Sequence, residues 1–277
     1  MTAHEQSALV WTEGKIIPIR ELSITATDRA LEHGLGLFES MRAKSGRVPL
    51  WGLHKQRLVQ SAEELGLLVK TKQLPNVTQL RDLLEASGLT RTDARLRLTL
   101  AGGSGKEPGR LWVAAHPLSP MKLDKLILAS KLWPVDERDP LVAYKTLNYW
   151  HRRRAYEAAQ AEEADEALSQ GLKGDIWEGS RTSLFLVKNE QLIAPPRDGA
   201  RLRSISDEVI ASFAREFETL ELIHRPVTES LLAGADEVIL TNAIRGIMTV
   251  SRWRDSTYAS PGPFAQKLRF LWQVKYF

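Results

Sequence analysis

The alternation of apolar and polar positions in the first part of the chain predicts short strands and amphipathic helices. Strands are expected within residues 8–20 and over 95–100, and helices over 53–66 and 76–87. The glycine-rich stretch 101–109 lacks the Gly-Lys-Ser/Thr order of a phosphate-binding P-loop, so it is expected to be an ordinary loop.

The rest of the chain alternates strand and helix patterns. Helices are expected over 149–163 and 206–217, and strands near 126–130 and over 166–169, 183–188, 191–194, 219–225 and 236–241. Pro117 and Pro120 indicate a linker. We therefore expect an α/β (α+β) fold with a small N-terminal α/β domain at 1–117, a linker at 118–125 and a larger C-terminal α/β domain at 126–277, with a cleft between the domains.

Composition narrows the class of protein. The chain has 277 residues, enough for two modest domains, and its 43% hydrophobic and 26% charged residues are typical of a soluble globular protein. The absence of cysteine excludes disulfides, thiolate metal sites and thiol nucleophiles, and we expect no metal. No apolar run approaches the roughly 20 residues of a membrane span. Met1–Ser7 lack the basic start and apolar core of a signal peptide, so the cytoplasm is the expected location.

The charge distribution does not favour nucleic acid as a partner. The net charge is +4, from 38 basic and 34 acidic side chains. The densest basic run, His151–Arg154, opens the expected helix at 149–163, whose last residues are acidic, so a solvated helix face is the better interpretation. A mildly positive potential suits anionic substrates and a phosphorylated cofactor equally well.

Lys145 and Glu178, each inside a short motif, are the best candidates for chemistry. The first motif is Tyr144-Lys145-Thr146-Leu147-Asn148-Tyr149, and the second is Trp177-Glu178-Gly179-Ser180-Arg181-Thr182-Ser183-Leu184-Phe185. A lysine that can form an imine and a carboxylate that can keep a pyridine nitrogen protonated are the minimum for pyridoxal 5′-phosphate (PLP) chemistry. Taken alone, two solvated surface residues would explain the pair equally well.

The order of seven motifs resembles the class IV aminotransferase family, the fold-type IV PLP enzymes. This family includes branched-chain and D-amino-acid aminotransferases and aminodeoxychorismate lyases. The motifs are Asp28–Arg42, His54–Leu58 with Ser61-Ala62, Lys145–Asn148, Ala164–Leu168, the Glu178 segment, Ser204–Ser206 and Ala235–Ala243. The resemblance implies the family fold, PLP as cofactor, and a homodimer with the site near the subunit interface.

The resemblance assigns the two catalytic roles. Lys145 forms the imine with PLP and then moves a proton, which requires its pKa to fall by a few units from about 10.4. Glu178 holds the pyridine nitrogen protonated. Gly179 and Ser180 let the backbone pass close to the ring. The alternatives are a surface lysine after a strand and a turn glutamate before one.

Further cofactor contacts follow from the same resemblance. Arg57 pairs with the phosphate, whose cradle is completed by the N–H groups of Ile205 and Ser206 at a helix N-terminus. Tyr149 approaches or packs beside the cofactor, Ser180 lies close to it, and Asn242 and Ala243 contribute a second phosphate-side loop after Thr241. Ser206 is equally well explained as a helix N-cap. The family often has arginine where this chain has Asp207, and the carboxylates of Asp207 and Glu208 would repel a phosphate.

The substrate side is less well defined. Phe38, Glu39 and Arg42 match pocket-lining positions of the family, although Phe38 is also compatible with a core position. Several relatives carry an arginine that traps the substrate carboxylate where this chain has Ala101. The arginines available for that role are Arg97, Arg95, Arg42 and Arg245.

The expected activity is amino transfer between an amino acid or amine and a 2-keto acid through Lys145. An aminodeoxychorismate lyase, which releases 4-aminobenzoate and pyruvate in folate synthesis, is the alternative, because the Lys-x-Leu-Asn and Thr-Asn-Ala motifs resemble the lyase and D-specific branches. A non-catalytic binding protein is a remote third possibility. The expected partners are small amino and keto acids and a second copy of the chain.

Overall fold

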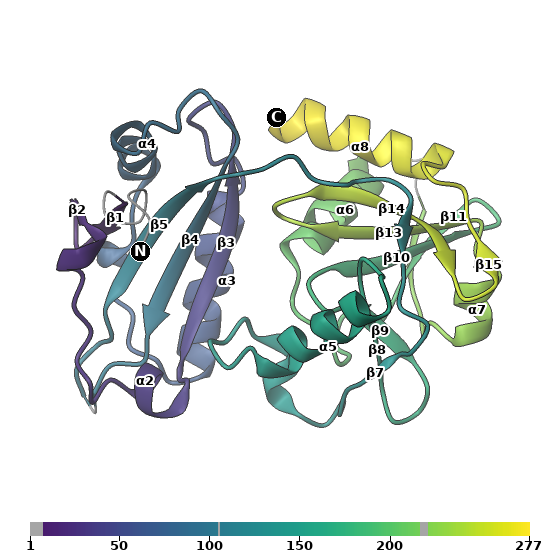
Figure 1. Ribbon diagram of the computed structural model, residues 1–277, viewed down its shortest axis with the longest axis horizontal. Helices are drawn as coiled ribbons and strands as arrows, with labels where there is room; N and C mark the ends of the chain where they lie inside the picture. The colour runs from purple at the N-terminus through teal and green to yellow at the C-terminus, as the bar shows by residue number, and fades with distance from the viewer. Residues whose placement is uncertain (1–7, 105, 217–220) are drawn as a thin grey trace. The chain divides into compact units, whose positions relative to one another are not determined.

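The computed structural model describes residues 8–104, 106–216 and 221–277, and these form two compact units (Figure 1). Unit 1 contains the chain up to Pro120 together with Tyr144–Asn148, and unit 2 contains Met121–Ala143 and Tyr149–Phe277. The Lys145 segment thus belongs to unit 1. The domain boundaries expected from the sequence stay a prediction. Residues 1–7, on which the expectation of no signal peptide depends, lie outside the described residues.

Unit 1 is an antiparallel sheet with helices against it. The described part holds a five-stranded sheet in the order β2-β1-β5-β4-β3. The strands are β1 (Leu9–Thr12), β2 (Lys15–Pro18), β3 (Gly36–Ala43), β4 (Ala94–Ala101) and β5 (Leu111–Pro117), and the α-helices are α2 (Arg29–His33), α3 (Trp51–Glu64) and α4 (Val77–Ala86). Helix α3 packs against β3, and α4 packs against β1. The predicted helices at 53–66 and 76–87 and the strand at 95–100 are confirmed within a few residues.

The two faces of β3 and β4 differ in chemistry. Leu37 lies opposite Leu100 and Met41 opposite Leu96, and all four side chains are buried in the same core as Leu58 of α3. Because side chains alternate across a strand, residues 38, 40 and 42 point to the other face, together with residues 95, 97 and 99 of β4. The sheet therefore carries an apolar core on one face and most of the predicted polar residues on the other.

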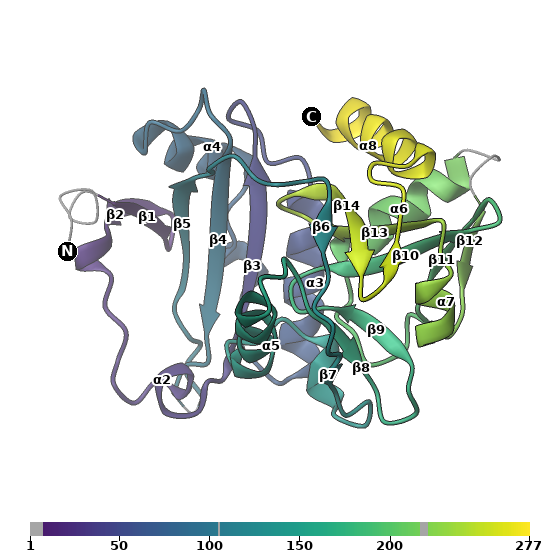
Figure 2. The same cartoon turned by 45° about the vertical axis from the view of Figure 1, so that its right-hand side comes forward.

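Unit 2 is built on a mixed sheet. Over the described residues this sheet has ten strands, in the order β15-β14-β13-β10-β9-β8-β7, with β11 and β12 beyond β10 and β6 beside β14. The strands are β6 (Leu126–Ile127), β7 (Trp133–Pro134), β8 (Leu168–Gln170), β9 (Ile176–Gly179), β10 (Ser183–Lys188), β11 (Gln191–Ala194), β12 (Leu222–His224), β13 (Glu237–Asn242), β14 (Gly246–Trp253) and β15 (Ser256–Thr257). The α-helices are α5 (Trp150–Ala161), α6 (Ile205–Glu216), α7 (Glu229–Ala233) and α8 (Pro263–Tyr276). Helices α6 and α8 pack against each other and against β13 (Figures 1 and 2).

The sequence patterns located most elements of unit 2. The strands at 183–188 and 191–194 and the helix at 149–163 are confirmed. The strand expected near 126–130 is shorter, because regular pairing with β14 is limited to Leu126 and Ile127. The elements that the sequence analysis missed include strands β3 and β5 of unit 1 and, in unit 2, strands β9 and β14 and helix α8. Residues 217–220, part of an expected helix and strand, lie outside the described residues.

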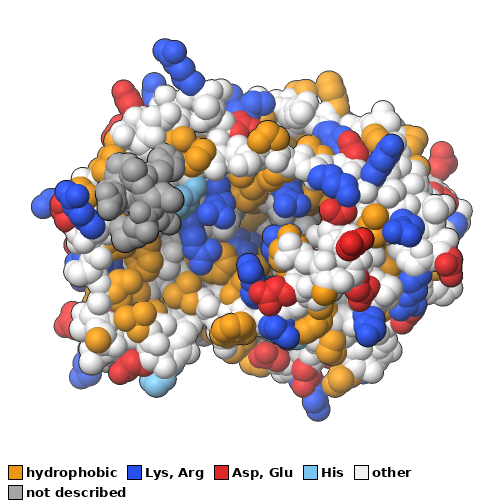
Figure 3. Space-filling model, viewed as in Figure 1, with side chains coloured by type: hydrophobic (Ala, Val, Ile, Leu, Met, Phe, Trp, Pro, Cys, Tyr) orange, Lys and Arg blue, Asp and Glu red, His pale blue; other side chains and the backbone are white. Residues whose placement is uncertain are grey.

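The described helices and the visible surface agree with the composition. None of the helices in the described parts of the chain is long and apolar enough to cross a membrane. On the face drawn in Figure 3, acidic and basic side chains are interspersed over the outer surface. Such mixing is expected when the two kinds of charge are nearly equal in number.

Candidate active site

Lys145 is held by backbone pairing along the start of β3. The Phe38 N–H donates to the Lys145 carbonyl at 3.0 Å, and the Leu147 N–H donates to the Gly36 carbonyl at 2.9 Å. A Cβ on Gly36 would lie 2.6 Å from Leu147 Cδ1 and 2.6 Å from the Leu100 carbonyl oxygen, so this close approach requires glycine. The catalytic lysine of the prediction therefore sits on a segment whose backbone is fixed to the sheet.

Phe38 has cationic groups near its ring. Lys145 Nζ lies 4.4 Å from the ring centroid, and the Arg97 guanidinium carbon lies 3.9 Å from it. Phe38 is only 4% exposed, so the structure brings the predicted catalytic lysine and two predicted substrate residues together in unit 1. Cation–π contacts of this kind contribute about 0.5–2 kcal/mol each.

Arg57 belongs to a buried network that sequence reasoning missed. Glu39 on β3 accepts hydrogen bonds from Arg57 Nε at 2.8 Å and Nη2 at 2.5 Å, a bidentate pair. The same carboxylate contacts His54 Nδ1 at 2.6 Å, and both Glu39 and His54 are 1% exposed. His54 and Arg57 are three residues apart on α3, so both face β3. Glu39 thereby fixes the orientation of the predicted phosphate arginine.

The protonation of this network follows from its geometry. Burial acts to raise the pKa of Glu39, but the Arg57 charge and the hydrogen bonds from His54 and Arg57 outweigh it and lower that pKa to about 2. Burial, with the charges of Arg57 and Lys145, lowers the pKa of His54 despite the opposing effect of Glu39. His54 is thus a neutral imidazole that donates its Nδ1–H to Glu39. Its Nε2 has no hydrogen-bond partner among the described residues.

Two other predicted arginines of unit 1 lie in different surroundings. Arg42, predicted to line the substrate pocket, forms an ion pair with Asp93. Arg95 lies opposite Arg42 in the β3–β4 register and opposite His116 in the β4–β5 register. Burial and the charges of Arg95 and Arg97 lower the pKa of His116.

Glu178 is the penultimate residue of β9 in unit 2, where an arginine that the sequence analysis did not name contacts it. Its Oε1 accepts hydrogen bonds from Arg152 Nη2 at 2.6 Å and from the Leu202 N–H at 2.9 Å. Burial acts to lower the pKa of Arg152, but the charge and hydrogen bond of Glu178 raise it overall. The sequence places Arg152 three residues after Tyr149, about one helical turn away, so its proximity to the site could have been inferred. In the sequence analysis, the basic run that contains Arg152 was instead assigned to a solvated helix face. Burial raises the pKa of Tyr149, which precedes α5.

Glu166 organises the turn between β9 and β10. This carboxylate, 2% exposed, accepts hydrogen bonds from the Ser180 N–H at 3.0 Å, the Arg181 N–H at 3.3 Å and Thr182 Oγ1 at 3.1 Å, and from Ser180 Oγ. A Cβ on Gly179 would lie 2.1 Å from Thr182 Oγ1, so this glycine is required by packing inside the turn. The Ser180 hydroxyl, predicted to lie near the cofactor, is bound to Glu166.

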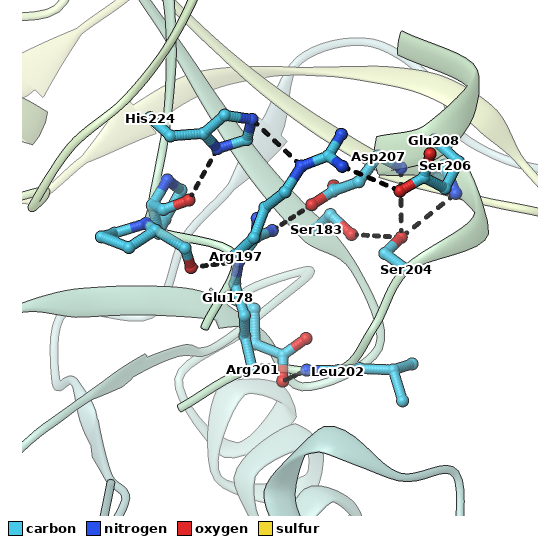
Figure 4. A network of polar contacts seen from close by, with 12 residues as sticks. Glu178, Ser183, Arg197, Arg201, Leu202, Ser204, Ser206, Asp207, Glu208 and His224 are labelled. Atoms are coloured by element: carbon cyan, nitrogen blue, oxygen red, sulfur yellow. Dashed lines mark hydrogen bonds and ion pairs between the residues drawn. The ribbon is translucent and has the colours of Figure 1, made fainter. Parts of the chain in front are cut away.

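The N-terminus of α6 offers a place for a phosphate. The helix begins at Ile205, and Ser204 Oγ accepts from the Ser206 N–H at 3.1 Å, so Ser204 rather than Ser206 is the capping residue. Ser183 Oγ donates to Ser204 Oγ at 2.7 Å, and Ser183 lies opposite Thr241 in the sheet (Figure 4). The hydroxyls of Ser206 and Thr241 are buried without a hydrogen-bond partner among the described residues. Unpaired buried donors beside a helix N-terminus fit an anionic group such as the PLP phosphate.

The acidic residues of the first α6 turn are neutralised. Arg201, 2% exposed, forms an ion pair with Asp207, and Arg197 Nη1 contacts Glu208 Oε1 at 2.9 Å (Figure 4). Burial raises the pKa of Asp207 against the opposing charge of Arg201. The expected repulsion between these carboxylates and a phosphate is therefore offset by arginines that the sequence argument did not pair with them.

Asn242 links two turns of unit 2. Its Nδ2 donates to the Arg181 carbonyl at 3.3 Å, and its Oδ1 accepts from the Arg245 N–H at 2.8 Å. Ala243 lies in the turn between β13 and β14, next to Asn242. The guanidinium carbon of Arg181 lies 3.3 Å from the centroid of the Tyr156 ring.

Comparison with known proteins defines the class of enzyme. Residues 36–253 match the family described as "Amino-transferase class IV". A protein of Methanocaldococcus jannaschii named "Putative branched-chain-amino-acid aminotransferase" is 28% identical over 253 residues, covering 87% of this chain and 86% of that protein. The D-alanine aminotransferase of Bacillus licheniformis is 23% identical, with 92% and 93% covered.

Solved structures show the same fold. The branched-chain aminotransferase of Thermoproteus uzoniensis, solved with norvaline, superimposes with a TM-score of 0.87 at 23% identity, covering 98% of this chain and 95% of that one. A "Putative 4-amino-4-deoxychorismate lyase" of Legionella pneumophila superimposes with a TM-score of 0.80 at 25% identity, covering 92% and 96%.

The chain therefore belongs to the class IV aminotransferase family, and it is a PLP-dependent enzyme with the fold-type IV architecture. The predicted family, fold class, enzyme class and cofactor are confirmed. The roles of the individual site residues stay predictions.

Proposed function

We propose that this enzyme transfers an amino group between an amino acid and a 2-keto acid, with Lys145 as the covalent attachment point for PLP. The observation that carries the proposal is the fixed Lys145 segment beside Phe38 in a chain of this family. Relatives named branched-chain or D-alanine aminotransferases support amino transfer as the reaction. The proposal includes a homodimer and a cytoplasmic location, and light scattering of the purified protein tests the first.

PLP, when bound, supplies an electron-withdrawing ring that makes the hydrogen on the amino-bearing carbon of the substrate acidic. Lys145 Nζ takes that proton and returns a proton in the second half of the exchange. Glu178 would hold the proton on the ring nitrogen. Arg152 and the Leu202 N–H both donate to its Oε1, so these hydrogen bonds orient the carboxylate and would leave Oε2 for this contact.

Each unit offers donors for the phosphate. In unit 1, Arg57, oriented by Glu39, supplies a planar fork of donors. In unit 2, the donors are the hydroxyls of Ser206 and Thr241 and the first N–H groups of α6, from Ile205 and Ser206. A charge-assisted hydrogen bond to such a group contributes about 1.5–3 kcal/mol.

A half-reaction tests the proposal. The PLP-loaded protein is mixed with one amino donor at a time without a keto acid, and its visible absorbance is recorded. We expect one donor to convert the cofactor to its amine form, and 2-oxoglutarate or pyruvate to restore the original spectrum. Borohydride reduction followed by peptide mapping should place the pyridoxyl group on Lys145, and Lys145→Ala should show neither result.

The lyase is the second candidate, favoured by the Legionella relative and by the Lys145–Asn148 motif. It makes a different prediction: no amino donor changes the absorbance, while aminodeoxychorismate is converted to 4-aminobenzoate and pyruvate. That result would show that the enzyme eliminates rather than transfers.

A further inference from the structure

Two half-buried arginines in the described part of unit 2 differ from the other buried or half-buried arginines there in forming no ion pair. The other buried or half-buried arginines described in this unit form ion pairs: Arg152 with Glu178, Arg201 with Asp207 and Arg269 with Asp124. The side chains of Arg181 and Arg245 are also half-buried, yet neither has an ion pair or polar hydrogen bond within the described parts of the chain.

Hydrogen bonds from Asn242 connect the backbone segments that carry the two arginines. Asn242 binds the Arg181 carbonyl through Nδ2 and the Arg245 N–H through Oδ1, which ties the β9–β10 turn to the β13–β14 turn. Glu166 fixes the first of these turns through the Arg181 N–H, and the Arg181 side chain lies against the Tyr156 ring. Burial and the charge of Arg181 lower the pKa of Arg245, and the opposing effects of Tyr156, Glu166 and Asp165 do not cancel them.

Two half-buried guanidinium groups that form no ion pair are unfavourable unless an anion joins them. The planar fork of arginine matches a carboxylate, which it can bind through two parallel hydrogen bonds. Every substrate of the proposed reaction carries at least one carboxylate. Of the arginines considered from the sequence, Arg42 is already paired with Asp93, whereas Arg245 has Arg181 as a second cation beside it.

We propose that Arg181 and Arg245 together bind a carboxylate group of the amino-acid and keto-acid substrates. This assignment rests on the proposed function for the identity of the ligand. Of these two arginines, Arg245 was among the candidates named from the sequence and Arg181 was not. Arg181 is therefore a new specificity residue, and Asn242 is the positioning residue that contacts the backbone of both. The cofactor phosphate is the other anion in the enzyme, but the hydroxyls of Ser206 and Thr241 and the α6 N-terminus already provide donors for it.

The test uses glutarate, an unreactive dicarboxylate, as a probe of the PLP-loaded enzyme. Its dissociation constant is measured by isothermal titration calorimetry for the wild type and for Arg181→Gln, Arg245→Gln and Arg181→Lys. Loss of one charge-assisted contact should weaken glutarate binding roughly ten- to a hundredfold in each glutamine variant. Lysine keeps the charge but loses the fork, so Arg181→Lys should fall between. Arg225→Gln, which removes an exposed arginine of the same unit, should bind glutarate as the wild type does.

The outcomes separate the possible sources of the anion. PLP affinity, measured by fluorescence titration of the apoenzyme, should be unchanged in both glutamine variants. Loss of PLP affinity with unchanged glutarate binding would assign the pair to the cofactor phosphate and overturn the proposal. Equal glutarate affinity in all variants would overturn it as well. If no donor undergoes the half-reaction but glutarate binding still depends on both arginines, the subsite stands and the proposed reaction fails.

Discussion

The substitution Glu39→Gln tests the charge network behind the predicted phosphate arginine. The change keeps the shape of the side chain and removes its charge, so Arg57 loses its buried counter-ion. A pKa lowered from the ordinary value of 4.5 to about 2 corresponds to about 3 kcal/mol of stability at neutral pH. Because the pKa is lower in the folded state, this contribution is present above pH 4.5 and is lost as the pH falls towards 2.

The pH dependence of the stability difference between the wild type and Glu39→Gln shows whether the charge of Glu39 causes that difference. From the same pKa values, the contribution of Glu39 falls from about 3 kcal/mol at pH 7 to about 2 kcal/mol at pH 3.5. Urea unfolding of the wild type and Glu39→Gln at both pH values measures this difference, and Glu85→Gln, on an exposed position of α4, is the matched control. A loss of stability that is identical at pH 7 and pH 3.5, or absent at both, would refute the reasoning.

Three further substitutions test other parts of the site. Arg57→Ala should weaken PLP binding roughly ten- to a hundredfold in a fluorescence titration; unchanged affinity would place the phosphate elsewhere. Arg152→Gln should reduce kcat while PLP stays bound, because Glu178 loses its orienting partner, and Arg152→Lys should restore part of the rate; equal loss in both would indicate a purely structural role. Glu166→Gln should destabilise the protein by about 1–3 kcal/mol in urea, since an NH2 donor replaces one of the two carboxylate oxygens that accept hydrogen bonds in the β9–β10 turn, whereas the exposed Glu163→Gln should not.

The local sequence pattern was sufficient to place helices and strands whose formation depends on residues close together in the chain. The strand at 183–188 and the helices at 53–66 and 149–163 could be placed because their apolar spacing records which face is buried. Strand β14 was missed because its first five residues are all buried and show no alternation of apolar and polar positions. The motif containing Lys145 indicated the chemistry, but not that its backbone pairs with β3.

Side-chain partners far apart in the sequence could not be predicted in the same way. Glu39 meets Arg57 only because α3 packs on β3, and Glu178 meets Arg152 only because α5 lies near the end of β9. A lone acidic or basic residue carries no record of its partner, so the sequence argument assigned Arg152 to a solvated face. The burial of Arg152 can be recognised only in the three-dimensional structure.

The start of α6 shows how such pairing changes a functional argument. From the sequence, Asp207 stands where related enzymes often have arginine, and its charge counts against a phosphate at this helix. In the structure the arginine is present six residues earlier, as Arg201, and it is buried against Asp207. The pair places one positive and one negative charge together, so an anion at the N–H groups and hydroxyls of the helix N-terminus would meet no net repulsive charge from this pair. The residue at one position alone therefore does not give the net charge of this turn, because that charge also depends on the arginine that pairs with it.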